Sequence, residues 1–190
     1  MSAVKYARCI NLCIVLLLCF FLSACNNGSS FHTGKYKSLA SDDVMIEFDK
    51  DSTGVLSSYE VTTGLSWEYE SEYLNIALNN GDNYSAFVSG NYILLSPFTQ
   101  ELHISKDIQN KDLFSAIVFI DGSSTESSTE YLSFQTNGSV IHNKNKTEIT
   151  KQYKRDGDIL IISYNDFQQY LLCYNHSVYL LQTEAMLKRE

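Results

Sequence analysis

The sequence predicts an all-β protein, an antiparallel meander that forms a barrel or a sandwich from two weakly similar halves. Three observations predict this fold class: short runs in which apolar and polar residues alternate, Asn-Gly and Asp-Gly dipeptides between these runs, and a long internal repeat. Alternation with a period of two places apolar side chains on one face of a strand, and these dipeptides are typical of tight hairpin turns.

The first 24 residues have the features of a signal peptide. Lys5 and Arg8 form a short positive region, the apolar run CINLCIVLLLCFFL follows, and small residues precede Cys25. This order is typical of a secretory signal that is removed from the mature protein. An uncleaved membrane anchor is the alternative interpretation.

The stretch Leu22-Ser23-Ala24-Cys25 closes this segment and resembles the lipobox of bacterial lipoproteins. The resemblance implies cleavage before Cys25 and acylation of its thiol, so that this residue contacts the membrane. Each buried CH₂ of an acyl chain contributes about 0.8 kcal/mol, and several chains on one residue therefore anchor a protein effectively permanently. Because Asn26 follows, the resemblance to enterobacterial lipoproteins implies the outer membrane of the cell envelope, with the protein facing the periplasm.

The mature chain, 25–190, is acidic. The signal peptide removes two of the 14 basic residues and none of the 22 acidic ones, which leaves 12 basic residues and a net charge of −10. Such a charge repels DNA and RNA, so we expect no nucleic-acid partner. Cys25 is used by the lipid, and Cys173 is then the only thiol left in the mature chain, which excludes an internal disulfide.

The order of segments follows from composition. Residues 26–34, NNGSSFHTG, are small and polar, Pro97 is the only proline, and TEAMLKRE at the C-terminus consists mostly of good helix formers. We therefore expect a signal peptide (1–24), a flexible tether (25–34), a first β-meander repeat (35–96), a linker (97–112), a second β-meander repeat (113–182) and a short C-terminal helix or tail (183–190).

An internal repeat supports the two halves. A shift of 86 residues places 45–95 on 131–181 without a gap, and most of the matched positions hold large apolar residues in the same strand phase. A duplicated core would keep such residues, whereas chance similarity between β-rich segments is the alternative. The matches include Phe48 and Phe134, Leu74 and Leu160, Ile76 and Ile162, and Tyr84 and Tyr170.

The first half also resembles the small lipocalin-like modules of bacterial lipoproteins. It opens with Gly34-Lys35-Tyr36, a Gly-x-aromatic start, and continues with a Phe-containing turn, FDKDSTG, and short alternating strands. The second half departs from this pattern because SAIVFIDG lacks the Gly-aromatic pair. The resemblance implies an up-and-down barrel or sandwich, and a carrier of this kind would hold a small apolar ligand in a cavity lined by Tyr and Phe.

The stretch 49–60, DKDSTGVLSSYE, matches the twelve-residue calcium loop of an EF-hand. Asp49, Asp51 and Thr53 hold loop positions 1, 3 and 5, Gly54 holds the sharp turn at position 6, and Glu60 is the acid at position 12. Hard oxygen ligands at this spacing are those that Ca²⁺ requires. Calcium is the one cofactor that the sequence suggests.

The residues around this loop favour a β-turn instead. The exit, VTTGLSWEY, contains β-branched residues and Gly64, which are poor helix formers, and an EF-hand loop lies between two helices. The repeat places Lys146 where the loop has Glu60. We therefore expect a strand, a tight polar turn and a return strand, with weak Ca²⁺ binding by Asp49 and Asp51 left open.

A second candidate site consists of aromatic residues that alternate with glutamates over 67–73. Trp67, Tyr69 and Tyr73 would share one face of a strand, and the acids Glu68, Glu70 and Glu72 the other. Repulsion between like charges on one face favours a solvated surface. The alternative is an aromatic platform with a polar rim, as sugar-binding surfaces have.

The sequence contains no constellation that would carry a reaction. It has no Gly-x-Ser-x-Gly elbow, phosphate-binding loop or His-Glu-x-x-His motif. We therefore expect no enzyme but a binding or interaction module, whose partner is an envelope protein or a small ligand. The alternatives are a calcium-binding protein and a lipocalin-like carrier. A carrier requires an empty interior, whereas an interaction module requires an exposed aromatic patch.

Overall fold

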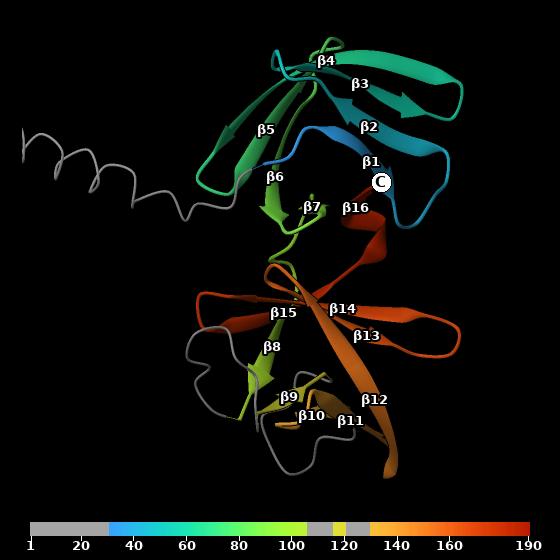
Figure 1. Cartoon of the computed structure of the whole chain (residues 1–190), viewed down its shortest axis with the longest axis vertical. Coiled ribbons are helices and arrows are strands. Elements are labelled where there is room, and N and C mark those ends of the chain that lie inside the picture. The colour runs from blue at the N-terminus through green and yellow to red at the C-terminus, as the bar shows by residue number, and fades with distance from the viewer. Residues whose placement is uncertain (1–30, 106–115, 121–129) are drawn as a thin grey trace, which may run out of the picture. The chain divides into compact units, whose positions relative to one another are not determined.

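The computed structural model describes residues 31–105, 116–120 and 130–190, and these form two closed antiparallel β-barrels (Figure 1). The predicted all-β class is confirmed, and the barrel, not the sandwich, is the form adopted. The signal peptide, Cys25 and residues 26–30 lie outside the described residues, as do parts of the predicted linker and second repeat.

Barrel 1 has eight strands in the order β1-β16-β7-β6-β5-β4-β3-β2. Seven of them come from the first half of the chain and β16 from its end. The strands are β1 (Gly34–Ser38), β2 (Val44–Phe48), β3 (Thr53–Ser58), β4 (Val61–Glu70), β5 (Tyr73–Leu78), β6 (Asn83–Ser89), β7 (Tyr92–Leu94) and β16 (Met186–Arg189).

Barrel 2 has eight strands in the order β10-β11-β12-β13-β14-β15-β8-β9. They are β8 (Glu101–Ile104), β9 (Ile117–Phe119), β10 (Glu130–Phe134), β11 (Ser139–Lys144), β12 (Thr147–Asp156), β13 (Ile159–Ser163), β14 (Gln168–Tyr174) and β15 (Ser177–Leu181). The Asn-Gly and Asp-Gly dipeptides at 80–81, 137–138 and 156–157 lie in the hairpin turns that they predict. Asp121-Gly122 lies outside the described residues.

Apolar side chains pack the interior of each barrel, because alternate residues of every strand point inward. The interior of barrel 1 contains Tyr36, Ile46, Phe48, Leu65, Leu74, Ile76, Leu78, Ala86, Val88, Ile93 and Leu187. That of barrel 2 contains Leu102, Ala116, Val118, Leu132, Phe134, Val140, Leu160, Ile162, Leu171, Cys173 and Val178. The described residues therefore build filled barrels, in which these side chains occupy the space that a carrier's ligand would need.

The two halves repeat the same ladder of strand pairs. Strands β2, β3 and β4 have the bounds of β10, β11 and β12 after a shift of 86 residues, whereas β6 has those of β14 after a shift of 85. Ile76 pairs with Tyr84, and its counterpart Ile162 pairs with Gln169. The second half is thus one residue shorter in the hairpin after β5. The gap-free alignment is wrong from there on, and Tyr84 corresponds to Gln169 instead of Tyr170.

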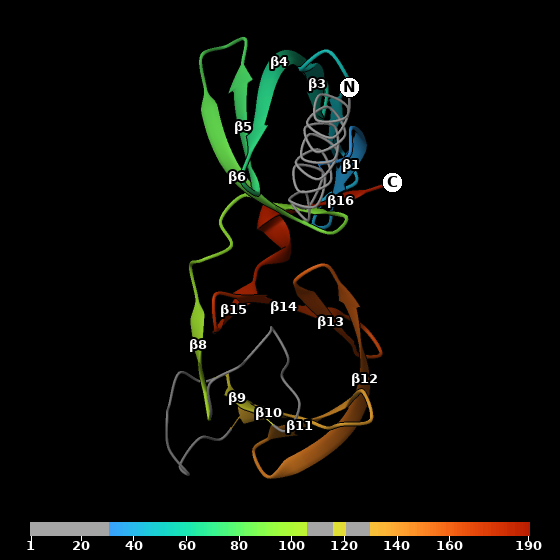
Figure 2. The ribbon, with the colours of Figure 1, turned by 60° about the vertical axis from the view of Figure 1, so that its left-hand side comes forward.

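The repeats exchange one strand. β8 follows β7 in the chain but closes barrel 2, where Leu102 pairs with Val178. β16 follows β15 but closes barrel 1, where Leu187 pairs with Ile93. In Figures 1 and 2 the C-terminal strand β16 lies beside β1, the first strand of the chain. Counted as two repeats of eight strands, β1–β8 and β9–β16, each barrel is therefore completed by the last strand of the other repeat.

Strands β8 and β16 lie in two segments that were predicted to be a linker and a helix or tail, so both predictions need correction. The linker 97–112 contains β8, whose Leu102 is buried while Glu101 and His103 face solvent, an alternation that is short but typical of a strand. The C-terminal segment 183–190 is a helix only over Thr183–Ala185, and the rest is β16. Burial of its apolar residues between β1 and β7 overrides their preference for a helix.

The barrels contact each other through two turns, one after β6 and one after β12. Asn91 donates from its backbone N–H to Asp156 Oδ1 at 3.2 Å and from its side chain to Asp156 Oδ2 at 2.9 Å. The backbone N–H of Asp158 donates to Ser89 Oγ at 2.8 Å. A third apolar cluster joins residues of both barrels around this turn–turn contact: Phe87, Tyr92, Leu94, Ile159, Tyr170, Leu172, Leu181 and Met186.

Candidate ligand-binding site

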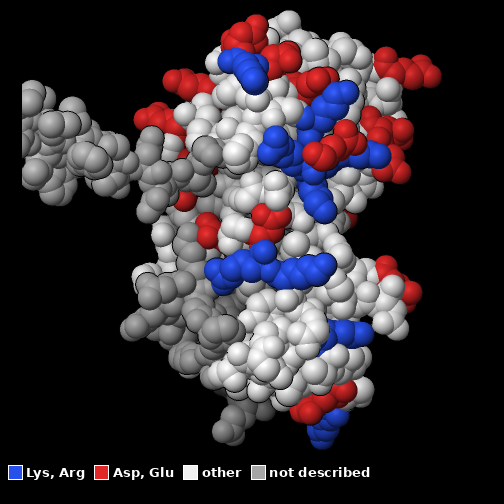
Figure 3. Space-filling view, in the orientation of Figure 1, with Lys and Arg blue, Asp and Glu red and all other residues white. Residues whose placement is uncertain are grey.

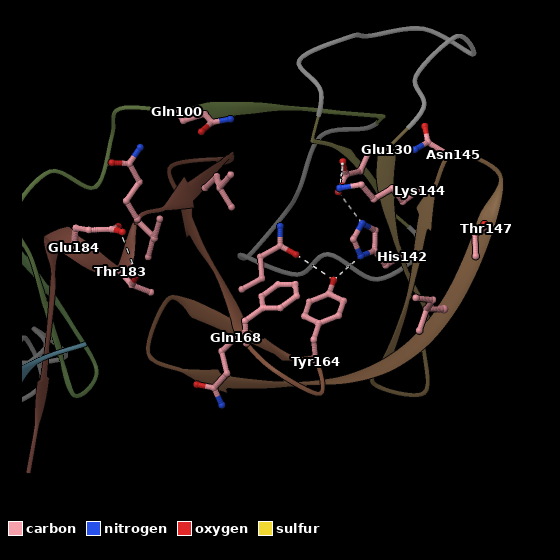
Figure 4. A pocket seen from close by; sticks show the side chains of 16 residues that line it. Gln100, Glu130, His142, Lys144, Asn145, Thr147, Tyr164, Gln168, Thr183 and Glu184 are labelled. Carbon is pink, nitrogen blue, oxygen red and sulfur yellow. Dashed lines mark hydrogen bonds and ion pairs between the residues drawn. The ribbon is translucent and has the colours of Figure 1, made fainter. Parts of the chain in front are cut away.

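An open cavity of about 860 Å³ lies at one end of barrel 2, where the turns between β11 and β12 and between β13 and β14 meet the end of β15 (Figure 4). We call it the barrel 2 mouth. Apolar and aromatic side chains form its floor, and amides and hydroxyls surround it. Its polar uncharged residues are Gln100, Asn145, Thr147, Gln168, Gln169, Gln182 and Thr183.

A chain of polar contacts crosses the mouth. His142 donates from Nε2 to Glu130 Oε1 at 3.0 Å, because a carboxylate can only accept. The hydroxyl of Tyr164 lies 2.7 Å from the ring's other nitrogen, Nδ1, and 3.1 Å from Gln169 Oε1, and donates its single proton to one of these two atoms. Figure 4 shows these contacts running from β10 through β11 to the turn after β13. They fix the ring of Tyr164 in one position.

The charges within this chain are compensated. The Glu130 carboxylate contacts His142 and also Lys144 Nζ, at 3.2 Å. His142 is only 8% exposed. Burial, and then the charge of Glu130, raises the pKa of Tyr164 to about 12. The phenol therefore remains protonated at neutral pH, where it can donate a hydrogen bond but cannot act as a base.

Tyr164 and Phe167 form a stacked aromatic pair. Their ring centroids are 4.4 Å apart and their planes differ by 9°. The backbone N–H of Tyr164 donates to the carbonyl oxygen of Phe167 at 2.9 Å, so the tight turn Tyr164–Phe167 brings both rings to one side. Phe167 is 59% exposed, and Ile149 of β12, 46% exposed, also lines the mouth. The pair thus offers a rigid apolar surface to the cavity.

The aromatic residues predicted from the alternation over 67–73 do not share one surface. Trp67 and Tyr69 point into barrel 1, with ring centroids 5.1 and 5.5 Å from that of Phe31. Tyr73 points the other way and packs on Phe87 at 5.6 Å. The period-two argument fails because the chain turns back at 71–72, so that Tyr73 begins the next strand opposite Glu70.

Phe31 corrects the predicted tether. Its ring lies among four others in barrel 1, those of Tyr36, Phe48, Trp67 and Tyr69. The hydroxyl of Tyr36 donates to the backbone carbonyl of His32 at 2.7 Å. Residues 31–34 of the predicted tether (25–34) therefore belong to the folded body. The signal for this was one large apolar residue in an otherwise small and polar segment.

The calcium loop is not closed in the structure. Asp49, Asp51 and Thr53 lie at the turn between β2 and β3, whereas Glu60 lies beyond the far end of β3. Thr53 donates to Asp51 Oδ1 from its hydroxyl at 2.6 Å and from its backbone at 3.2 Å, and these bonds lower the pKa of Asp51. Across the described ranges, no three His, Cys, Asp or Glu side chains gather as metal ligands would. The loop is the β-turn that its exit sequence favours.

Acidic and basic side chains both lie on the face of the molecule that Figure 3 shows, and many of them are neighbours. On barrel 1, Lys35 pairs with Glu47 at 3.8 Å and Lys37 with Asp42 at 2.7 Å. Surface pairs of this kind contribute roughly 0–1 kcal/mol each.

Comparison with known proteins gives no match: no family model, no curated protein and no solved structure is significantly similar to this chain. In the part of the chain that the structure describes, no helix has the length and apolar character needed to cross a membrane.

Buried phenols predict how stability changes at alkaline pH. Burial raises the pKa values of Tyr36, Tyr92 and Tyr164 to about 12 from the ordinary 10.0. The folded state holds these protons more tightly than the unfolded chain, so their contribution is complete below about pH 10 and is lost as the pH rises toward about 12. We expect the melting temperature, followed by circular dichroism, to fall across this window and to fall less steeply in Tyr164→Phe. A flat profile would contradict the burial of these phenols.

Proposed function

We propose that the chain is a lipid-anchored protein of the cell envelope that acts as a non-catalytic binding module, and that it engages its partner at the barrel 2 mouth. The observation that carries this proposal is the mouth itself. It is open, it exposes an aromatic ring, and its polar groups are held by one another before any ligand arrives. Open cavities with apolar surfaces and a few fixed polar groups are typical of binding sites.

The anchoring part of the proposal rests on the lipobox-like stretch and on Phe31. Only five residues, 26–30, separate the expected lipid on Cys25 from the ring of Phe31 in barrel 1. An extended chain covers at most about 3.6 Å per residue, so the six steps from Cys25 to Phe31 reach roughly 20 Å. Such a tether would hold barrel 1 close to the outer-membrane surface, on the periplasmic side.

The non-catalytic part rests on the groups that could react. Tyr164 is held as a neutral phenol, and both ring nitrogens of His142 already have partners. Cys173 is fully buried in the interior of barrel 2. A nucleophile or base must reach its substrate, and these groups are engaged with their own neighbours. Binding at the mouth, where Phe167 is exposed, fits this chemistry better than catalysis does.

Two arms test the proposal. In the first, cells grown with labelled palmitate should incorporate label into the wild-type protein and into Phe167→Ala but not into Cys25→Ala, which should leave the membrane fraction. Label in Cys25→Ala would contradict anchoring at this residue.

In the second arm, the acylated wild-type protein and Phe167→Ala are each used to capture material from solubilised envelope. We expect the wild type to retain a component that Phe167→Ala loses. Tyr84→Ala is the matched control, because Tyr84 is an exposed aromatic residue, 47% exposed, at the start of β6 in barrel 1. Equal capture by all three proteins would contradict binding at the mouth.

A further inference from the structure

The charged groups inside the barrel 2 mouth already have partners. The carboxylate of Glu130, which is partly exposed, contacts His142 at 3.0 Å and the exposed Lys144 at 3.2 Å. A second ion would have to displace these partners or compete with them. The contacts inside the site therefore favour a neutral ligand.

The uncharged polar groups of the mouth indicate which functional groups a neutral ligand would have. Five amide side chains and two threonine hydroxyls line the mouth. An amide has both donors and acceptors, and so does a hydroxyl, so a ring of amides matches a ligand whose surface bears many hydroxyls. A purely apolar ligand would displace the water around these groups without replacing its hydrogen bonds, at a cost in free energy.

The aromatic pair supplies the complementary apolar surface. One face of Phe167 is covered by Tyr164, and the side chain remains 59% exposed. Sugar rings carry hydroxyls on their edges and C–H groups on their faces, and these faces stack on aromatic rings. Because the hydroxyl of Tyr164 is held by His142 and Gln169, little side-chain freedom is lost when a ring stacks on the pair.

An extended peptide is less well matched to this site. Peptides that bind β-proteins commonly add a strand to an open sheet edge, where backbone groups are unpaired. Barrel 2 is closed, and each of its eight strands has a neighbour on both sides. The groups available at the mouth are side-chain amides, not a backbone edge.

We infer that the barrel 2 mouth binds a neutral oligosaccharide, with one sugar ring stacked on Phe167 and its hydroxyls bonded to the surrounding glutamines. This inference deepens the proposed function and rests on it. Gln182, which is exposed, is the amide placed to bond the hydroxyls, because the amide of Gln168 is already bonded to Tyr170 and Ser163.

The test is calorimetric titration of the acylated protein in a polyoxyethylene detergent, since a sugar-based detergent would compete. The probes are maltoheptaose, cellohexaose and chitohexaose. We expect at least one to bind in the micromolar-to-millimolar range. Phe167→Ala should weaken binding at least tenfold, and Gln182→Ala several-fold. Tyr84→Ala should bind as the wild type does, and melting curves should show that all variants are folded.

Two results would overturn the inference: none of the three sugars binds, or Phe167→Ala binds with the affinity of the wild type. The envelope capture described above separates this failure from that of the proposed function. If the sugars do not bind but Phe167→Ala still loses a captured protein, the mouth is a protein-binding site and only the ligand class is wrong. If the captured material is also unchanged, both proposals fail.

Discussion

A chain that ends at Ala185 should fail to form barrel 1. Without β16, strands β1 and β7 become open edges, and the pairs that Leu187 makes with Ile93 and Ser38 are lost. Met186 and Leu187 are 1% and 3% exposed, and burial of such a side chain contributes about 1.5–3 kcal/mol. The sum is a large part of the 5–15 kcal/mol that stabilises an ordinary domain. We expect loss of the cooperative melting transition and association through the open edges, measured by circular dichroism and size-exclusion chromatography.

The matched control for this truncation is Lys188→Ala, which keeps the strand. Lys188 is exposed and lies 5.9 Å from the ring of Tyr92, so its removal should change stability by roughly 0.5 kcal/mol or less. A peptide of residues 182–190 added in excess should restore part of the melting transition of the truncated chain. A truncated protein that melts like the wild type would show that β16 does not close barrel 1.

Gly157→Ala should destabilise the protein far more than a glycine substitution at a turn that lies away from the contact between the barrels. Gly157 has φ +58°, and a Cβ placed there would lie 2.5 Å from the backbone nitrogen of Gly90 and 2.7 Å from Ser89 Oγ. Backbone cannot move aside as a flexible side chain can, so the turn–turn contact must separate. We expect a loss of roughly 3 kcal/mol or more, measured as a fall in the urea midpoint.

Gly138→Ala is the matched control for this substitution. Gly138 also has a positive φ, +78°, but a Cβ there would meet nothing within 4 Å. Alanine at position 138 would therefore cost only the free energy of holding a non-glycine residue at a positive φ, roughly 1 kcal/mol. The difference between the two variants measures the contact between the barrels. Equal losses for Gly138→Ala and Gly157→Ala would contradict that contact.

Local sequence patterns were sufficient for the class of the fold and for most of its strands. Alternation placed Leu74, Ile76 and Leu78 on one face, and these residues are buried in barrel 1. The turn dipeptides at 80–81, 137–138 and 156–157 fall between paired strands, because a tight turn requires a residue with positive φ and glycine adopts it without strain. These features depend on neighbouring residues alone.

The strand exchange was not predictable by the same reasoning. The pattern around Leu102 indicates a strand, but no local feature tells which barrel it joins. The residues of β16 favour a helix in isolation, and only burial of Met186 and Leu187 makes them a strand. Pairing between distant segments depends on tertiary packing, which propensity does not contain.

The candidate site was missed for a related reason. Sequence reasoning singled out Trp67 because it belongs to the aromatic residues that alternate with glutamates over 67–73, yet its ring contributes to the core of barrel 1. Tyr164 and Phe167 were available in the stretch YNDFQQY, where an Asn-Asp turn separates two aromatic residues beside two amides. The polar partners Glu130 and His142 lie 34 and 22 residues before Tyr164, and only closure of barrel 2 brings them together.

The exchange of β8 and β16 also fixes when each barrel can be completed. A ribosome makes the chain from its first residue onward, so β1 to β7 exist long before Met186–Arg189. Barrel 1 must therefore wait, seven strands long and open between β1 and β7, until Met186–Arg189 have been made and, for an exported chain, delivered. Barrel 2 has all eight strands as soon as Leu181 is present. The half nearest the N-terminus is the last to close, which reverses the usual order in which domains fold during synthesis.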